Sequence, residues 1–153
     1  MPQSIVPDAP PGDDADIGAI NDLVGFHLRL AYGAVYRHFM ETFAHLKLTQ
    51  KQVSVLWLVS DHPGIGQSDL ARRLQMDRAT VMAIINRLQA RGYLAREAHG
   101  QDARRRALML QPAGSAALEE ARTAILEHEA WLLARFTKRE VKQLVSLLTR
   151  IHG

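Results

Sequence analysis

The spacing of apolar residues between positions 66 and 92 predicts two short helices joined by a tight turn. The second helix should start after Asp77, a favourable N-cap residue, and end before Gly92, a favourable residue just past a helix end. One face of this helix is apolar and should be buried: Val81, Ile84, Ile85 and Leu88. The helix before it also has apolar residues that face inward: Leu70, Ala71 and Leu74. Gln75 and Met76 remain for the turn, so the two helices form a helix–turn–helix unit.

The opposite face of the second helix differs from an ordinary solvated face, which would mix Glu and Lys. Its residues are small or neutral, with an arginine at the edge: Ala79, Met82, Ala83, Asn86, Ala90 and Arg87. A helix that enters the major groove of DNA must lie close to the base edges and carry no acid there. This face therefore favours DNA recognition.

A hairpin should follow the second helix. Residues 93–98 and 106–111 are strand-like, and residues 99–105 between them are polar and basic. Such a hairpin is the "wing" of a winged helix, whose tip can reach the minor groove or phosphates. Ile65 and Gly66, just before the helix–turn–helix, can pair with the wing strands.

Longer helices are expected on both sides of this unit, at residues 14–46, 49–61, 112–135 and 137–151. Capping boxes mark two of their starts, Thr49 with Gln52 and Thr137 with Glu140. Pro112 suits the first position of another. The apolar positions of the first long helix cover most of its circumference, which predicts burial on more than one side. A second copy of the chain is the simplest extra partner.

The predicted fold is therefore mainly α with a small β-hairpin wing. Residues 1–13 hold four of the six prolines and should form a flexible arm. Residues 14–46 and 112–153 should form a helical dimerisation region, and residues 49–111 the winged helix–turn–helix DNA-binding region.

Length and composition narrow the function. At 153 residues the chain is one domain by size, with no apolar run near the length of a membrane span and no signal-peptide pattern, so we expect a cytoplasmic protein. It has no cysteine, which excludes disulfides, thiolate metal sites and cysteine-based peroxide sensing.

Charge is distributed unevenly along the chain. Residues 1–46 carry two arginines against six carboxylates, a net charge of −4. Residues 67–106 carry nine arginines against four carboxylates, a net charge of +5. All cations of the central segment are arginines, which suit forked contacts with phosphate and guanine. A basic segment on a helix–turn–helix with a wing is an electrostatic footprint for nucleic acid.

One ordered pattern runs across almost forty residues: Asp77-Arg78-x-Thr80-Val81, Arg87-Leu88-x-x-x-Gly92-Tyr93-Leu94-x-Arg96, Asp102-x-Arg104 and Leu108-x-Leu110-x-x-x-Gly114. It resembles the MarR family of bacterial transcription regulators, and the alignable region extends roughly from Asp16 to Ile151. The resemblance implies that the first and last helices interdigitate with a second subunit. The homodimer would then read a near-palindromic double-stranded DNA operator whose half-sites lie about one helical turn apart.

Several residues are candidates for contact with DNA. They are Gln67, Ser68, Arg78, Thr80, Met82, Ala83, Asn86, Arg87, Arg104 and Arg105. Asn86 can pair with adenine through two hydrogen bonds, and Arg78 or Arg87 can bind guanine or phosphate. Asp102 should support the wing by holding an arginine. Met82 and Ala83 stand where relatives usually carry polar residues, so wing contacts and DNA shape should carry more of the specificity.

The first long helix carries His27, His38 and His45 near one line. One shared metal ion is disfavoured, because the helical rise separates His27 from His38 by some 16 Å. The histidines can instead be half-buried and paired across the dimer, or can line an effector pocket. In this family a small molecule often binds between the first helices and the DNA-binding lobe. The candidate effector contacts are His27, Arg29, Tyr32, His38 and Trp57.

The segment from Gly25 to Ala31 also resembles regulators of aromatic-acid catabolism, which implies a small aromatic acid or its coenzyme A thioester as effector. We therefore expect a homodimeric repressor released from its operator by such a ligand, with no cofactor and no metal. An enzyme is not expected, since the sequence has no nucleophile–base pair, Gly-rich phosphate loop or metal-ligand spacing. A constitutive DNA-binding regulator without an effector is the alternative.

Overall fold

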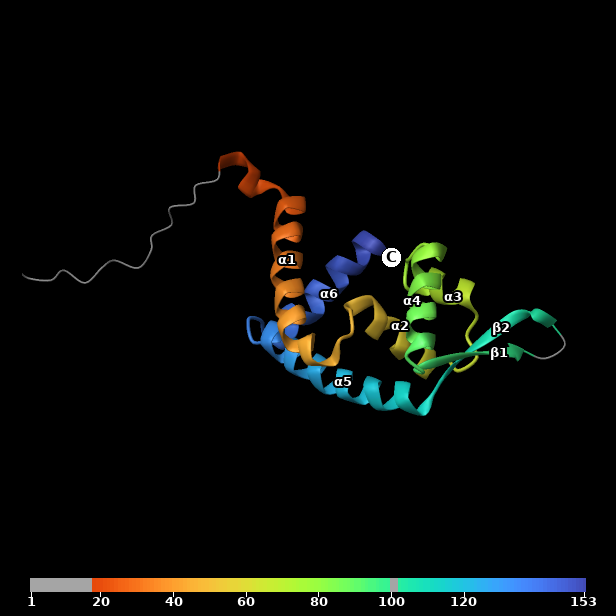
Figure 1. The fold of residues 1–153 in the computed structure, drawn as a ribbon. Helices are drawn as coiled ribbons and strands as arrows, with labels where there is room; N and C mark the ends of the chain where they lie inside the picture. Colours follow the sequence, from red (N-terminus) through yellow and green to blue (C-terminus); the bar gives the residue numbers. More distant parts are fainter. Residues whose placement is uncertain (1–17, 100–101) are drawn as a thin grey trace, which may run out of the picture. The chain divides into compact units, whose positions relative to one another are not determined.

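The computed structural model describes residues 18–99 and 102–153, and the side chains of residues 18–98 and 106–153 (Figure 1). The chain divides into two compact units, with the boundary inside one helix, between Val35 and Tyr36. The elements are η1 (Gly18–Asp22), α1 (Val24–Phe43), η2 (Ala44–Leu46), α2 (Gln50–Asp61), α3 (Gln67–Arg73), α4 (Arg78–Ala90), β1 (Leu94–His99), β2 (Asp102–Leu110), α5 (Pro112–Leu133) and α6 (Lys138–His152). The prediction of a mainly helical chain with one hairpin is confirmed.

The prediction of one uninterrupted first helix is wrong. A short 3₁₀ helix, η1, precedes α1, and the N–H of Leu23 bonds to the carbonyl of Ile20 three residues back. Gly18 adopts a left-handed φ of 69°. At the other end, η2 tightens the last turn and Lys47 closes it with a left-handed φ of 51°. Periodicity alone could not reveal these breaks, because a 3₁₀ turn preserves the local apolar pattern. The first four positions of the expected helix lie outside the described residues.

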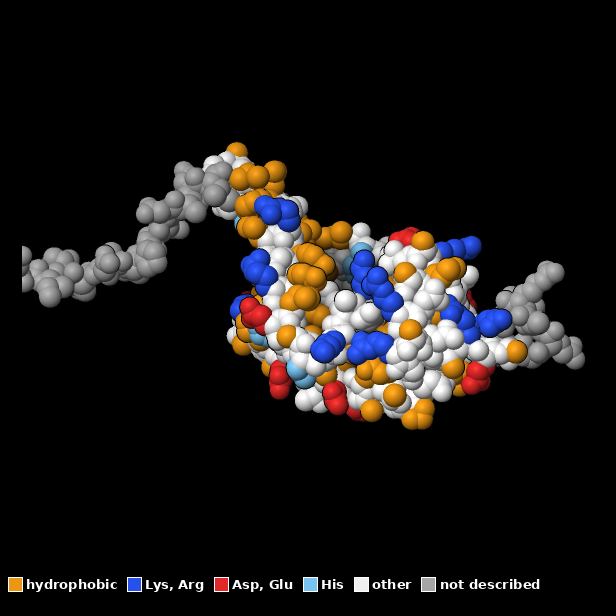
Figure 2. All heavy atoms as spheres, in the orientation of Figure 1, with side chains coloured by type: hydrophobic (Ala, Val, Ile, Leu, Met, Phe, Trp, Pro, Cys, Tyr) orange, Lys and Arg blue, Asp and Glu red, His pale blue; other side chains and the backbone are white. Residues whose placement is uncertain are grey.

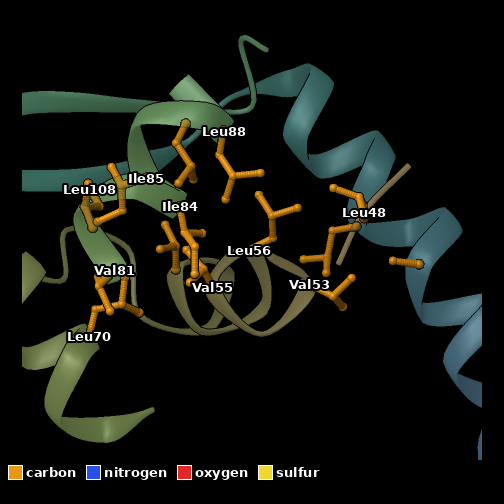
Figure 3. Close-up of a cluster of buried hydrophobic side chains, with 14 of the residues drawn as sticks. Leu48, Val53, Val55, Leu56, Leu70, Val81, Ile84, Ile85, Leu88 and Leu108 are labelled. Carbon is orange, nitrogen blue, oxygen red and sulfur yellow. The ribbon is translucent and has the colours of Figure 1, made fainter. Parts of the chain in front are cut away.

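The hydrophobic core of the second unit forms around α4. All four apolar residues predicted for its inner face are buried, and they pack with side chains of α2, α3 and β2 (Figure 3). Leu70 and Ala71 of α3 are buried as well, and Leu74 packs against the core. This burial fixes which face of α4 remains at the surface.

The ends of α4 follow the predicted capping. The carboxylate of Asp77 accepts the backbone N–H of Thr80 at 2.8 Å and its hydroxyl at 2.6 Å. These two hydrogen bonds lower the pKa of Asp77, because they stabilise the ionised form. Gly92 adopts a φ of 71°, and its N–H caps the carbonyl of Gln89. Gln75, in the tight turn before α4, also has a left-handed φ of 51°.

The wing is an antiparallel pair in which Leu94 lies opposite Leu110. Its base is joined to the loop before α3, because the N–H of Gly64 bonds to the carbonyl of Leu108 and the N–H of Leu108 bonds to the carbonyl of Ile65. The predicted pairing of this loop with the wing is therefore confirmed. Strand β2 begins at Asp102, earlier than the predicted 106. The polar residues there gave no alternation of apolar and polar positions to mark a strand.

Two helices complete the second unit. Pro112 occupies the first turn of α5, and the predicted capping box of Thr137 and Glu140 starts α6. Helix α6, all of whose residues are described, buries none of them. Its apolar side chains are exposed or half-buried, and Val145 is 58% exposed. Among the residues that the structure describes, no helix combines the length and apolar character needed to cross a membrane.

The structure explains why the ordered sequence pattern ends in a glycine, Gly114. A Cβ added there would lie 2.1 Å from the backbone oxygen of Tyr93. We expect Gly114→Ala to lower the free energy of unfolding by about 1–3 kcal/mol, because the first turn of α5 must move away from the wing. Urea denaturation measures this change. Gly25→Ala is the control, since its Cβ would meet nothing within 4 Å. Equal stability of the two variants would contradict the close approach.

Candidate nucleic-acid interface

The face of α4 opposite the core is open to solvent. Met82 is 49% exposed, and Ala79, Ala83, Asn86 and Arg87 are exposed as well. Thr80 is half-buried and its hydroxyl donates to Asp77, so its role in this structure is to cap the helix. The surface presented by α4 is thus narrow, almost neutral and free of acid beyond its N-cap.

Arginines surround this face. Those with exposed side chains on or next to α3, α4 and the base of the wing are Arg72, Arg73, Arg78, Arg87, Arg91 and Arg106. Figure 2 shows positively charged side chains at the base of the wing. Arg72 is paired with Asp69 at 3.3 Å. Arg91 donates to the carbonyl of Lys47 at 2.8 Å and lies over the ring of Tyr93.

A groove of about 650 Å³ lies between the wing and the start of α3. Gln67 and Ser68, both predicted to contact DNA, line one side together with Asp69, and Arg96 and Arg106 line the other. Backbone N–H groups, a hydroxyl and guanidinium groups are the donors that proteins use to bind DNA phosphates. The structure therefore brings these predicted residues together with two arginines of the wing strands.

Arg96 has a role that the sequence did not reveal beyond its place in the ordered pattern. Its Nη2 donates to Oδ1 of Asn86 at 2.8 Å, and its Nη1 donates to Oε1 of Gln89 at 2.5 Å. The side chain thus joins strand β1 to the exposed face of α4. A pair of hydrogen bonds between Asn86 and adenine would use the same Oδ1 atom that accepts from Arg96, so the adenine amino group would have to share it. No local sequence signal links residues seven and ten positions apart on different elements.

The predicted wing-tip contacts remain predictions. Asp102, Arg104 and Arg105 lie in strand β2, but their side chains fall outside the described residues.

Three predicted effector contacts belong to the first unit. His27 donates from Nε2 to the backbone oxygen of Asn21 at 2.6 Å. The guanidinium of Arg29 lies over the ring of Phe26 at 5.3 Å, and Tyr32 is exposed. His27 therefore ties the start of α1 to η1, and Arg29 and Tyr32 remain at the surface of this unit.

The other two predicted effector contacts, His38 and Trp57, lie in the second unit and contact α5. His38 meets His128 with Nδ1 atoms 2.7 Å apart, and it stacks on Trp131 with ring centroids 4.0 Å apart. Trp57 is half-buried under the guanidinium of Arg122. His128 is 5% exposed and was missed from the sequence. Its place after Leu118, Ala121 and Ala124, at three- to four-residue spacing, is the signal that could have found it.

The histidine pair has a charge constraint. Burial lowers the pKa of His128, and the positive charge of a protonated His38 lowers it further. Two neutral rings share one proton between their Nδ1 atoms, whereas two protonated rings place two N–H groups against each other. The contact between the end of α1 and α5 therefore favours the neutral form of His128.

The architecture of a helix–turn–helix, a paired wing and an acid-free surface helix defines a winged-helix DNA-binding protein. Comparisons with known proteins narrow this class. The model of the MarR family matches residues 46–105. The repressor CouR, solved bound to a 23-mer DNA duplex, is 30% identical, and the match covers 90% of this chain and 97% of CouR with a TM-score of 0.85. CouR has also been solved with p-coumaroyl-CoA.

Two further relatives agree. BpsR of Bordetella bronchiseptica, whose DNA binding is regulated by 6-hydroxynicotinic acid, is 29% identical, with 89% of this chain and 97% of BpsR covered and a TM-score of 0.83. A regulatory protein for the hcr operon of Thauera aromatica is 29% identical over 136 residues, which cover 88% of this chain and 82% of the relative. The chain belongs to the MarR family. It is accordingly a transcriptional regulator and not an enzyme.

The lowered pKa of His128 makes stability depend on pH. Below about pH 6.5 the unfolded chain binds a proton that the folded chain resists, so the free energy of unfolding should fall as the pH drops from 6.5 toward the lowered pKa. The contribution is fully present above pH 6.5. His128→Gln should flatten this dependence in denaturation curves recorded between pH 7.5 and 5. His45→Gln, at an exposed position of η2, is the control. An unchanged slope in His128→Gln would exclude the pair as the cause.

Proposed function

We propose that the protein is a homodimeric transcriptional repressor that binds a near-palindromic operator and is released from it by a small aromatic acid or its coenzyme A thioester. The observation that carries the DNA-binding part is the exposed, acid-free face of α4 beside a paired wing. A rigid core behind α4 holds this face outward, so that its side chains can reach base edges in the major groove.

The proposed DNA contacts fall into two groups. Met82 and Ala83 of α4 offer apolar contact, for instance to thymine methyl groups, while Arg78, Arg87 and Asn86 offer polar contact. Gln67, Ser68 and the wing arginines Arg104 and Arg105 bind the phosphate backbone or the minor groove, and Asp102 supports the wing. Thr80 contributes indirectly, because its hydroxyl donates to Asp77, the N-cap residue of α4. The support for this assignment is the groove beside α3 and the ring of exposed arginines.

The proposed dimer is supported by apolar surface that each unit leaves open. In the second unit the exposed side chains of α6 include Leu144, Val145, Leu147 and Ile151. In the first unit Leu23, Val24, Leu28 and Leu30 are exposed. Large exposed apolar patches mark interfaces in soluble proteins. Residues 14–46 and 112–153 are therefore the proposed dimerisation region, and residues 49–111 the DNA-binding region.

The proposed effector class rests on the relatives. CouR binds p-coumaroyl-CoA, and BpsR responds to 6-hydroxynicotinic acid, so both ligands derive from an aromatic carboxylic acid. The candidate contacts in this chain offer aromatic faces and hydrogen-bond donors: His27, Arg29, Tyr32, His38 and Trp57. Release would be a population shift, in which the ligand prefers a spacing of the two α4 helices that does not fit the operator.

The test is an operator-binding titration with DNA from upstream of the protein's own gene. At low salt concentration we expect the protein to bind this DNA as one dimer per site. At least one member of a panel of aromatic acids and their coenzyme A thioesters should weaken this binding. Sedimentation of the complex gives the stoichiometry. Binding without release by any compound would favour a constitutive regulator. Failure to bind any DNA containing the regulator's promoter region would contradict the proposal.

The wing has its own test. Arg104→Ala should weaken binding to all DNA sequences and reduce the slope of log affinity against log salt concentration by about 1, because one phosphate contact is lost. Arg139→Ala removes an exposed arginine from α6 and is the matched control, expected to leave the slope unchanged. The same slope in Arg104→Ala and in the unmodified protein would remove the wing tip from the mechanism.

A further inference from the structure

We propose that Arg96 is a positioning residue that locks the wing to α4 and determines which hydrogen-bonding groups Asn86 and Gln89 present to DNA. The inference rests on the proposed binding of DNA by α4. It goes further, because it assigns a role to a residue that contacts the reading helix from another element. It also predicts which bases that helix accepts.

The geometry uses the fork of the guanidinium group. Asn86 and Gln89 are three residues apart on α4, so their side chains are neighbours on its surface. The two terminal nitrogens of Arg96 each donate to one of their amide oxygens, at 2.8 Å and 2.5 Å. A planar group with two parallel donors can hold both oxygens at once, whereas a lysine ammonium on a flexible stem lacks this fixed fork.

The two hydrogen bonds from Arg96 to Asn86 and Gln89, which we call the clamp, strengthen the attachment of the wing to α4. A two-stranded hairpin is marginally stable alone. Here its base is bonded to the loop before α3 through Leu108, opposite Arg96 in the register. The side chain of Arg96 adds a bond from the other strand to α4. The wing and the exposed face of α4 are thereby held in one relative orientation, although the backbone links them only at the end of the helix.

The clamp also fixes the orientation of two amides. An arginine carries donors and no acceptor, so the oxygens of Asn86 and Gln89 must face Arg96. Their NH₂ groups then remain as donors for DNA. Donors select base edges that present acceptors in the major groove, such as guanine N7 and O6 or thymine O4, and reject the amino group of cytosine. In the two-bond pairing of Asn86 with adenine, the adenine amino group would have to share the Oδ1 atom that already accepts a hydrogen bond from Arg96.

Arg96 could instead act as a simple phosphate contact, since it also lines the groove beside Gln67 and Ser68. The two roles respond differently to a change that keeps the charge. A phosphate contact tolerates lysine, while the clamp does not.

The experiment compares Arg96→Lys and Arg96→Ala with Asn86→Ala and the double variant Arg96→Ala/Asn86→Ala. Arg139→Lys, at an exposed position of α6 that does not line this groove, is the matched control. Each protein is titrated with the operator and with a set of its single-base variants at several salt concentrations. Circular dichroism of each variant confirms that it is folded.

We expect Arg96→Lys to lose affinity on the order of tenfold, close to the loss in Arg96→Ala, while Arg139→Lys stays near the unmodified protein. At the base pair contacted by Asn86, Arg96→Ala should shift the preference toward adenine, because the amide oxygen is released. Asn86→Ala and the double variant should both lack any preference there. A merely structural role would weaken all sequences equally.

Two results would overturn the proposal. One is full affinity in Arg96→Lys together with a uniform loss and a lower salt slope in Arg96→Ala, which would make Arg96 a phosphate contact. The other concerns the clamp without DNA: a double-variant cycle of Arg96 with Asn86 on thermal unfolding should show coupling. Strict additivity would exclude the clamp. If the unmodified protein binds no DNA, the proposed function fails, and the unfolding cycle still decides whether the clamp exists.

Discussion

Burial of one side of α4 is the constraint on which the rest of the structure depends. Helix α4 carries one buried apolar face and, opposite it, one face of small and polar residues. Val81, Ile84, Ile85 and Leu88 pack against α2, α3 and β2, and the core closes around them. Rotation of α4 about its axis would expose these side chains at a cost of about 1.5–3 kcal/mol each. The surface that meets solvent is therefore set by the interior and not by its own contacts.

The sequence predicted this part of the fold well, because each signal was local. The N-cap Asp77, the left-handed Gly92 and the two capping boxes act within a few residues, and the helical spacing of apolar residues marks the buried faces. Where the signal was weak, the prediction was wrong. The start of β2 lies in a polar stretch without alternation, and the break between η1 and α1 leaves the apolar spacing almost unchanged.

The candidate site was predicted less completely, since its contacts join residues far apart in sequence. Arg96 reaches Asn86 and Gln89 across the junction of helix and strand, and His38 meets His128 from a different helix, ninety positions away. A pattern on one element cannot show which residue of another element will lie beside it. Asn86 shows the effect on chemistry: its type suggested a base contact, but its hydrogen-bonding capacity is shared with a neighbour that the sequence did not place.

The exposed apolar stripe of α6 affects how operator occupancy depends on the concentration of the protein. All residues of α6 are described and none is buried, although its apolar side chains recur at helical spacing. If this stripe is covered only when two chains associate, folding of the helix and assembly are linked, and the stability of each chain rises with its concentration. At concentrations below the dissociation constant of the dimer, the amount of operator-binding species varies with the square of the amount of chain. Small changes in synthesis would then produce steep changes in occupancy, without any ligand.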